Sequence, residues 1–237
     1  MRGAELAARY AFPPNAKGYC GASSFVSALR NHLAGKAAPL EQELKKFKAH
    51  YAYLSLIARE NRVEPFDLDV VKAFWLGNPL LRSVSRESLS DFIVSELFSG
   101  KQKSRAERLA ARLPRGVVPH HSFNSLYINF VSGKVKKTVE NYDSCCVSAG
   151  RVLSASGKKA DVVRDSIAWD GRFFLTKKTE KISLERCGIR FLDAVRPGDV
   201  LSIHWGMAIQ RLKPSDATAL NKYTRMNIDA INRSLER

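Results

Sequence analysis

The chain has 237 residues, of which 45% are hydrophobic and 26% charged, a composition that is typical of globular proteins and excludes a wholly disordered chain. The length suffices for one large domain or two small ones. No run approaches the roughly 18 consecutive apolar residues of a membrane helix, and charged side chains stand at the start of the chain, where a signal peptide needs an apolar run. We therefore expect a cytoplasmic protein with no membrane partner.

The formal net charge is +16, from 39 Lys and Arg against 23 Asp and Glu. A surplus of this size makes a polyanion, above all a nucleic acid, a candidate partner. Both parts of the chain carry a positive surplus. Residues 1–143 hold 22 basic and 13 acidic side chains, and residues 144–237 hold 17 basic and 10 acidic ones. The charge therefore indicates no basic tail, and it does not specify a function alone.

The first 143 residues predict a mainly α-helical domain. Four segments carry helical signals, the first with apolar side chains recurring every three or four positions on one face: 39–59, 66–76, 85–98 and 101–113. Asp67 and Ser85 are the expected N-caps of the second and third helices, and Gly100 is the expected stop of the third. The fourth helix is rich in Lys and Arg, and we expect that charged face to be solvated.

The pattern changes after Cys145 to short β-prone runs separated by turn residues. Five strands are predicted at residues 147–153, 161–164, 172–176, 189–192 and 200–203. Many short strands with tight turns are typical of a small barrel or sandwich. Residues 214–237 return to helical spacing, with Ser215 as a candidate cap. The expected fold class is α+β, with a helical domain at 1–143 and a β-barrel domain with a C-terminal helix at 144–237.

The four cysteines do not form a disulfide pattern, since none belongs to a CxxC pair and two are adjacent: Cys20, Cys145, Cys146 and Cys187. We expect reduced thiols. Free cysteine is among the most buried residue types, so Cys146 and Cys187 are interpreted as small core or surface residues.

The most specific local motif lies in the second half of the chain. Cys145 is followed, after four residues, by the sequence GRV at 150–152, and about fifty residues later by GDVLSIHWGMAI at 198–209. Residues 144–237 thereby resemble the small hydrogenase-assembly chaperones of the HypC/HupF family. In that family a Cys precedes Gly-Lys/Arg-Val at the same interval, and the barrel closes with a strand containing Gly-Asp and His-x-Gly-x-Ala-Ile.

The resemblance implies a five-stranded OB-like barrel with a C-terminal helix, acting with protein partners in assembly of the iron centre of nickel-iron hydrogenases. It also implies that Cys145 holds the iron unit and that His204 lies near it. A thiolate is a soft ligand suited to such iron, and an imidazole can be a second ligand or fix the protonation of the thiol. We therefore expect Cys145 and His204 to converge, with iron as the implied cargo.

Two further clusters lie in the helical half. The whole chain resembles an uncharacterised prokaryotic family in which PPNxxGYCG (here 13–21), WxGN (75–78) and PHHSF (119–123) occur together. Cys20 in the first motif, with His120 or His121 in the last, has the minimum composition of an activated thiolate or a metal site. We expect the Cys20 thiol to lie within reach of one imidazole. The alternative is that the prolines and glycines shape a loop and the histidines cap helix ends.

Three functions therefore remain open. The first is a hydrogenase-maturation-like assembly or scaffolding protein that uses Cys145 and His204. The second is an OB-like nucleic-acid-binding protein, with bases stacked on aromatic side chains and phosphates bound by lysines: Phe173, Phe174, Tyr142 or Trp169, and Lys177, Lys178 and Lys181. The third is an enzyme built on Cys20, His120 and His121. No GxGxxG or GxxxxGK[ST] loop, HExxH or GxSxG motif occurs, so nucleotide-dependent catalysis, metalloprotease and serine-hydrolase activity have no support.

Overall fold

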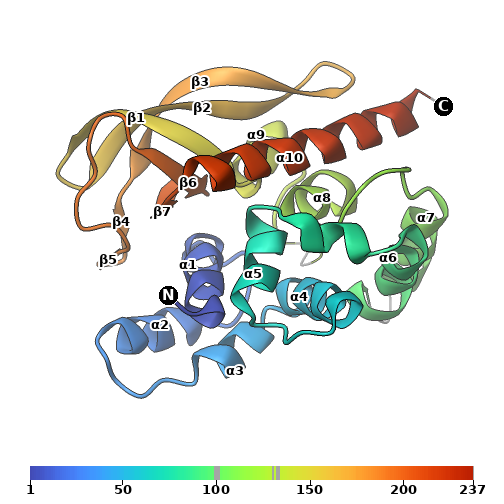
Figure 1. The fold of residues 1–237 in the computed structure, drawn as a ribbon, viewed down its shortest axis with the longest axis horizontal. Helices are drawn as coiled ribbons and strands as arrows, with labels where there is room; N and C mark the ends of the chain where they lie inside the picture. Colours follow the sequence, from blue (N-terminus) through green and yellow to red (C-terminus); the bar gives the residue numbers. More distant parts are fainter. Residues whose placement is uncertain (99–101, 130, 132–133, 237) are drawn as a thin grey trace.

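Helices make up most of the chain before residue 145, strands follow from residue 148 to residue 211, and one long helix ends the chain (Figure 1). The computed structural model describes residues 1–98, 102–129, 131 and 134–236. The fold is therefore mixed α+β, with an N-terminal helical region, a five-stranded sheet and a C-terminal helix. Within the described residues no helix is long and apolar enough to cross a membrane.

The N-terminal region is built from short helices: α1 (Gly3–Ala16), α2 (Phe25–Leu33), α3 (Leu40–Lys45), α4 (Lys48–Asn61), α5 (Leu68–Trp75), α6 (Arg86–Phe92), α7 (Lys103–Ala111), α8 (His121–Phe123) and α9 (Val139–Cys145). Shorter turns join some of them: the 3-10 turn η1 (Pro79–Ser83) and the π-helical turns η2 (Ile93–Leu97) and η4 (Asn124–Ile128).

Several predicted helices are confirmed, and their caps explain where they start. Asp67 accepts a hydrogen bond from the Asp69 N–H and begins α5, and Ser85 accepts one from Ser88 and begins α6. The single helix predicted over 39–59 is instead two helices, because the backbone turns at Phe47 between α3 and α4. The stop predicted at Gly100 lies outside the described residues.

Helix α1 is not among the helices predicted from the sequence. Ten of its 14 residues are buried, and its charged side chains are Glu5 and Arg9, so it has only a weak helical pattern of apolar and polar residues. Pro13 and Pro14 lie in its last turn, where each removes one backbone N–H. The double proline therefore marks the end of a buried helix, and the turn with Cys20 follows it.

Five strands form one sheet: β1 (Ser148–Ser156), β2 (Lys159–Trp169), β3 (Phe173–Ser183), β6 (Val200–His204) and β7 (Met207–Arg211). The strand order β1-β2-β3-β7-β6 closes on itself, because β6 also pairs with β1. All pairings are antiparallel except β3 with β7, which meet at Ser183 and Met207. The prediction missed β7, and residues 189–192 contribute only to a separate small hairpin, β4 (Glu185–Arg186) with β5 (Ile189–Arg190).

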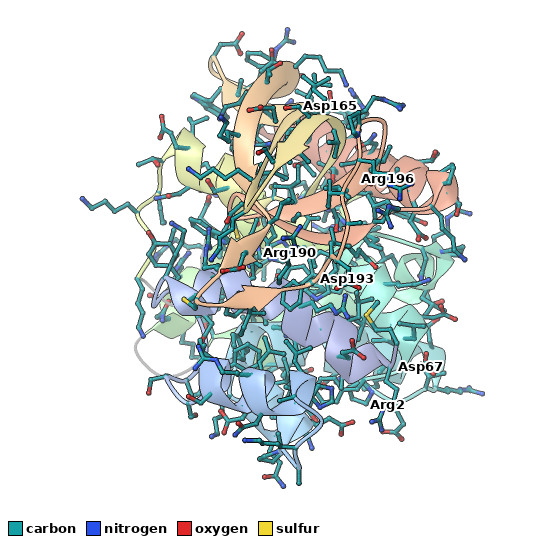
Figure 2. The ribbon with its side chains drawn as sticks, turned by 90° about the vertical axis from the view of Figure 1, so that its left-hand side faces the viewer. Arg2, Asp67, Asp165, Arg190, Asp193 and Arg196 are labelled. Carbon is teal, nitrogen blue, oxygen red and sulfur yellow. The ribbon has the colours of Figure 1, made fainter. Side chains whose placement is uncertain are left out.

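One hydrophobic core is shared by the helical and strand regions. Its buried members come from α1, α4 and α5 and also include Met207 and Ile209 of β7 and Phe191 from the segment before β6. The change in secondary structure falls at the end of α9, close to the predicted boundary at 143, but the main core continues across it. Figure 2 shows the two regions stacked, with Asp165 of β2 at one end and Arg2 and Asp67 toward the other.

Helix α10 (Pro214–Leu235) lies between the sheet and the N-terminal helices (Figure 1). It begins with Pro214 at its first turn and Lys213 as N-cap, so Ser215 is not the cap as predicted. The fully buried Asn227 on this helix accepts a hydrogen bond from Val118 N–H at 2.9 Å and donates to Ser122 Oγ at 3.0 Å. This side chain fastens the segment that carries His120 and His121.

We predict that Asn227→Ala lowers the free energy of unfolding by about 1–3 kcal/mol, because it leaves the buried Val118 amide without its partner. Urea denaturation followed by circular dichroism measures the change. Asn221→Ala on the same helix is the matched control, since no hydrogen bond of the Asn221 side chain is found among the described residues. Equal stability losses in the two variants would contradict the fastening role.

Candidate metal centre

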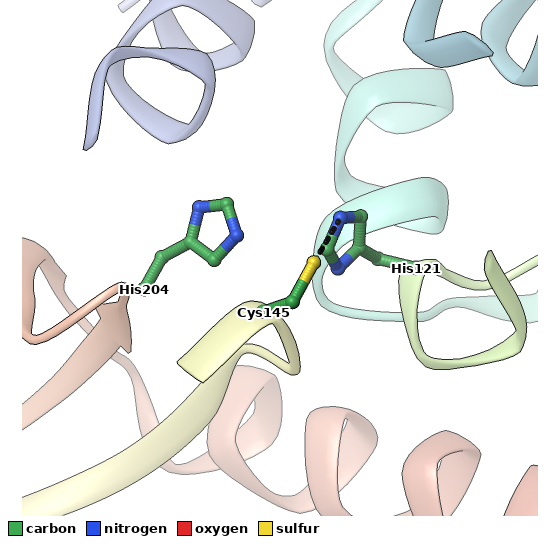
Figure 3. Close-up of side chains that lie close together, drawn as sticks. All are labelled: His121, Cys145 and His204. Atoms are coloured by element: carbon green, nitrogen blue, oxygen red, sulfur yellow. Dashed lines mark hydrogen bonds between the residues drawn. The ribbon is translucent and has the colours of Figure 1, made fainter. Parts of the chain in front are cut away.

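Three buried side chains from distant parts of the chain converge between the helices and the sheet (Figure 3). His121 is the first residue of α8, Cys145 the last of α9 and His204 the last of β6. One potential ligand atom from each lies within 4.8 Å of the other two. The convergence of Cys145 and His204 agrees with the expectation from sequence, and His121 joins them.

His204 is oriented by the backbone of α1. Its Nδ1 lies 2.8 Å from the carbonyl oxygen of Tyr10, and this oxygen can only accept, so Nδ1 carries the proton. In a regular helix that carbonyl would accept from the N–H four residues later, but that residue is Pro14, which has none. Among the described residues, the buried Nε2 of His204 makes no hydrogen bond of normal geometry. This nitrogen lies on the side of the ring that faces Cys145.

Cys145 and His121 face each other across the centre. The Cys145 Sγ lies 4.0 Å from His121 Nε2, and His121 Nδ1 is buried without a partner. The Trp205 N–H donates to the Ser144 carbonyl at 2.8 Å, which ties the end of β6 to the end of α9. The hydrogen bonds to the Tyr10 and Ser144 carbonyls thus position His204 beside Cys145.

All three groups are uncharged near neutral pH because they are buried. Burial raises the pKa of Cys145 to about 12, although Ser125 and Trp205 act in the opposite direction. Burial lowers the pKa of His204 to about 3 and that of His121 well below its usual value. Neutral imidazole is the form that binds metals, and a thiol binds after losing its proton.

Aromatic rings enclose the centre and set the position of its histidines. The Trp75 ring stacks on His121 with centroids 4.3 Å apart and lies 5.2 Å from the His204 ring. Trp75 also donates its Nε1–H to His50 Nε2 at 3.2 Å. The lone pair of His50 is therefore already used, and this fourth nearby imidazole is not a ligand candidate. Trp75, the first residue of the WxGN motif, thus packs against His121 and His204 of the cluster and uses its N–H to bind His50.

A buried ion network holds the helix that presents Cys145. Asp143 accepts two hydrogen bonds from the Arg164 guanidinium, at 2.9 and 2.6 Å, and one from the Ile167 N–H at 2.7 Å. Arg164 also donates to Glu180 on β3. Burial acts to raise the pKa of Asp143, but Arg164 outweighs it and holds the pKa below its usual value. Asp143 therefore remains an anion that joins α9 to the sheet.

The other predicted pairing, Cys20 with His120 or His121, is not formed by any hydrogen bond among the described residues. His120 instead caps α8, accepting from the Ser122 N–H, as the alternative interpretation expected. Burial raises the pKa of Cys20 to about 11, which is opposite to the shift that activates a nucleophile. Cys20 still lies near enough to act on the pKa of Cys145.

The lysines expected to bind phosphates are neutralised by neighbouring carboxylates. The pairs are Lys177 with Asp165 at 2.9 Å, Lys178 with Glu180 at 3.0 Å, and Lys181 with Asp161 at 3.7 Å. Of the expected stacking residues, Trp169 and Phe174 are exposed, whereas Phe173 is buried. This face therefore offers little uncompensated positive charge to a nucleic acid.

We predict that Pro14→Ala changes the tautomer of His204, because the new N–H competes with the imidazole for the Tyr10 carbonyl. Nitrogen-15 NMR of the labelled histidines detects the change as a shift of the Nδ1 and Nε2 signals. Pro13→Ala is the matched control, since the new N–H at position 13 would donate to the carbonyl of Arg9 and not to that of Tyr10. Unchanged His204 signals in Pro14→Ala would contradict the proposed role of the proline.

All four cysteines are free, as predicted. The model of a protein family described as a family of unknown function (DUF6390) matches residues 1–237. No curated protein and no solved structure matches the chain.

Proposed function

The chain belongs to the DUF6390 family over its whole length, and we propose that it binds one transition-metal ion through His121, Cys145 and His204 and acts as an assembly protein for a metal centre. The observation that carries the proposal is the His204 imidazole, whose Nδ1–H donates to a backbone carbonyl while its buried Nε2 makes no hydrogen bond of normal geometry among the described residues. A ligand histidine in metalloproteins usually donates its other ring N–H in this way, which fixes its tautomer.

The donor set favours iron or zinc. Two neutral imidazoles and one thiol suit borderline to soft transition metals and disfavour magnesium or calcium, which prefer oxygen ligands. Three protein donors leave at least one coordination position for an exogenous ligand, as in metal sites that react or exchange. The resemblance to the HypC/HupF chaperones adds iron as the cargo, since Cys145 and His204 match the residues that handle it there.

The fold supports the same proposal. The closed order of the five strands, with Cys145 just before β1 and His204 at the end of β6, is what an OB-like barrel of the chaperone type requires. The helical region adds His121 to that pair. We therefore propose that the helices supply a third ligand, and that the protein works in the cytoplasm, where reduced thiols persist.

Metal titration of the anaerobically purified, metal-free chain tests the proposal. Wild-type protein is expected to bind one Co²⁺ with a thiolate-to-metal charge-transfer band. Separate titrations of the metal-free chain with Fe²⁺ and with Zn²⁺ are expected to show one site each. Cys145→Ser, His121→Ala and His204→Ala should each weaken binding by at least about tenfold, and Cys145→Ser should abolish the charge-transfer band. Cys146→Ser is the matched control, because Cys146 is a neighbouring buried thiol outside the cluster.

Two outcomes would contradict the proposal. One is the absence of stoichiometric metal binding by wild-type protein whose circular dichroism shows that it is folded. The other is equal metal binding by Cys145→Ser and Cys146→Ser. The assembly role is tested separately by affinity capture, in which hydrogenase-assembly proteins are expected to be recovered with wild-type protein and lost with Cys145→Ser.

A further inference from the structure

An arginine-lined pocket lies at the end of the molecule where α6, α7 and the C-terminal part of α10 are found (Figure 1). Its volume is about 940 Å³. Of the described residues that line it, none is acidic and six are arginines: Arg86, Arg105, Arg108, Arg112, Arg115 and Arg233. From this pocket we infer a binding site for a small organic polyphosphate.

At four arginines of the pocket, no carboxylate of the described residues neutralises the positive charge. Within the described part of the chain, no carboxylate lies within 4.0 Å of the guanidinium groups of Arg108, Arg112, Arg115 or Arg233. Elsewhere on the protein the exposed lysines of β3 each have such a partner. Gathering several cations without counter-charges costs free energy, and a bound polyanion removes that cost.

Two of the arginines are held in place by backbone carbonyls. Arg86 donates to the Leu113 carbonyl at 2.9 Å, and Arg105 donates to the Ile128 carbonyl at 2.6 Å. Arg105 also lies over the Phe98 ring, 4.9 Å from its centroid. These contacts orient the two guanidinium groups. A planar guanidinium in a fixed orientation binds phosphate through two parallel hydrogen bonds.

The remaining lining is apolar and aromatic, which distinguishes this pocket from a bare anion site. Leu109 and Leu235, with the ring of Tyr127, supply surface for a base or another flat apolar group. Tyr127 donates its hydroxyl to the Leu109 carbonyl at 2.6 Å, so its ring is fixed. A pocket of about 940 Å³ is at the upper end of the range for small-molecule sites, about 300–1,000 Å³. A nucleoside triphosphate has the size, the charge and the flat group that this lining accommodates.

The site binds phosphate through side chains alone, and so it needs none of the glycine-rich loops that the sequence lacks. The role inferred for this site is binding alone, without hydrolysis or group transfer. It is also independent of the metal centre, since none of the lining residues is a ligand there.

Isothermal titration calorimetry of the full chain with ATP, tripolyphosphate, AMP and adenosine tests the inference. ATP is expected to bind with one site per chain, more tightly than tripolyphosphate or AMP, while adenosine shows no measurable binding. ATP should also raise the melting temperature, because it binds the folded state. The charge-reversal pair Arg112→Glu with Arg233→Glu should weaken ATP binding by at least about 100-fold, since it removes two charge-assisted contacts and adds repulsion.

The matched control is Arg82→Glu with Arg172→Glu, which makes the same change in net charge at exposed arginines outside the pocket. Binding by this control should stay within about twofold of wild type, as expected for distant and screened charges. Equal weakening in the two pairs would overturn the inference, because it would show attraction by net charge alone. Tighter binding of a single-stranded RNA oligonucleotide than of ATP would also overturn it and would assign the pocket to a nucleic acid.

Discussion

Asp143→Ala should lower the free energy of unfolding by about 3–5 kcal/mol, the loss expected when one partner of a buried ion pair is removed. The reason is that the Arg164 guanidinium, whose side chain is 5% exposed, then loses two hydrogen bonds and much of its counter-charge. Ile167 N–H loses its acceptor as well. Urea denaturation measures the change.

The same variant should also loosen the end of α9, two residues before Cys145, and hydrogen exchange of the α9 amides is expected to increase. Lys177→Ala is the control, because it removes an ion pair between an exposed lysine of β3 and Asp165 of β2. A surface pair of this kind contributes at most about 1 kcal/mol. A loss below about 1 kcal/mol in Asp143→Ala would mean that the network does not support α9.

Gly77→Ala should lower the free energy of unfolding by about 2–5 kcal/mol, as the sum of backbone strain and a steric clash. Gly77 has a φ of +86°, and an added Cβ would lie 2.1 Å from the Tyr223 ring on α10. Something must shift to accept it, and the ring belongs to the helix that joins both halves of the fold. Thermal and urea unfolding measure the loss.

Gly157→Ala separates the two causes. Gly157 also has a positive φ, +57°, but nothing lies within 4 Å of its added Cβ, so only the strain of about 1–2 kcal/mol remains. Equal losses in the two variants would show that the approach of Tyr223 is unimportant. The WxGN motif therefore has two roles. The Trp75 ring packs against His121 and His204, and Gly77 leaves room for Tyr223 of α10.

The sequence predicted the fold class and several helix starts because those signals are local. Asp67 and Ser85 act within three residues of their own positions, and the change from helical to strand pattern needs no tertiary information. Helix α1 was missed because most of its residues are buried, so that only Glu5 and Arg9 mark its polar face. Strand β7 was missed although it belongs to the segment that carried the family resemblance.

The candidate site was only half predictable for a similar reason. Cys145 and His204 were paired through a motif that spans one region of the chain. His121 was expected beside Cys20, because motifs give residue types but not which of two adjacent imidazoles turns inward. The structure turns His120 to cap α8 and directs His121 to Cys145. No sequence pattern predicted the role of Tyr10. Its carbonyl oxygen is available to His204 because Pro14, four residues later, has no N–H to donate.

The hydrogen bonds between α1 and the sheet also have a consequence for folding during biosynthesis. Tyr10 contacts Ser202, His204 and Gln210, which lie 192, 194 and 200 positions later in the chain. A ribosome therefore releases an apolar helix long before it makes the strands that cover it, and such surface is prone to aggregation until then. The three side chains of the candidate metal centre meet only after β6 has emerged. A chain that stops before residue 204 has the Cys145 thiol and the His121 imidazole but lacks the third member of the cluster.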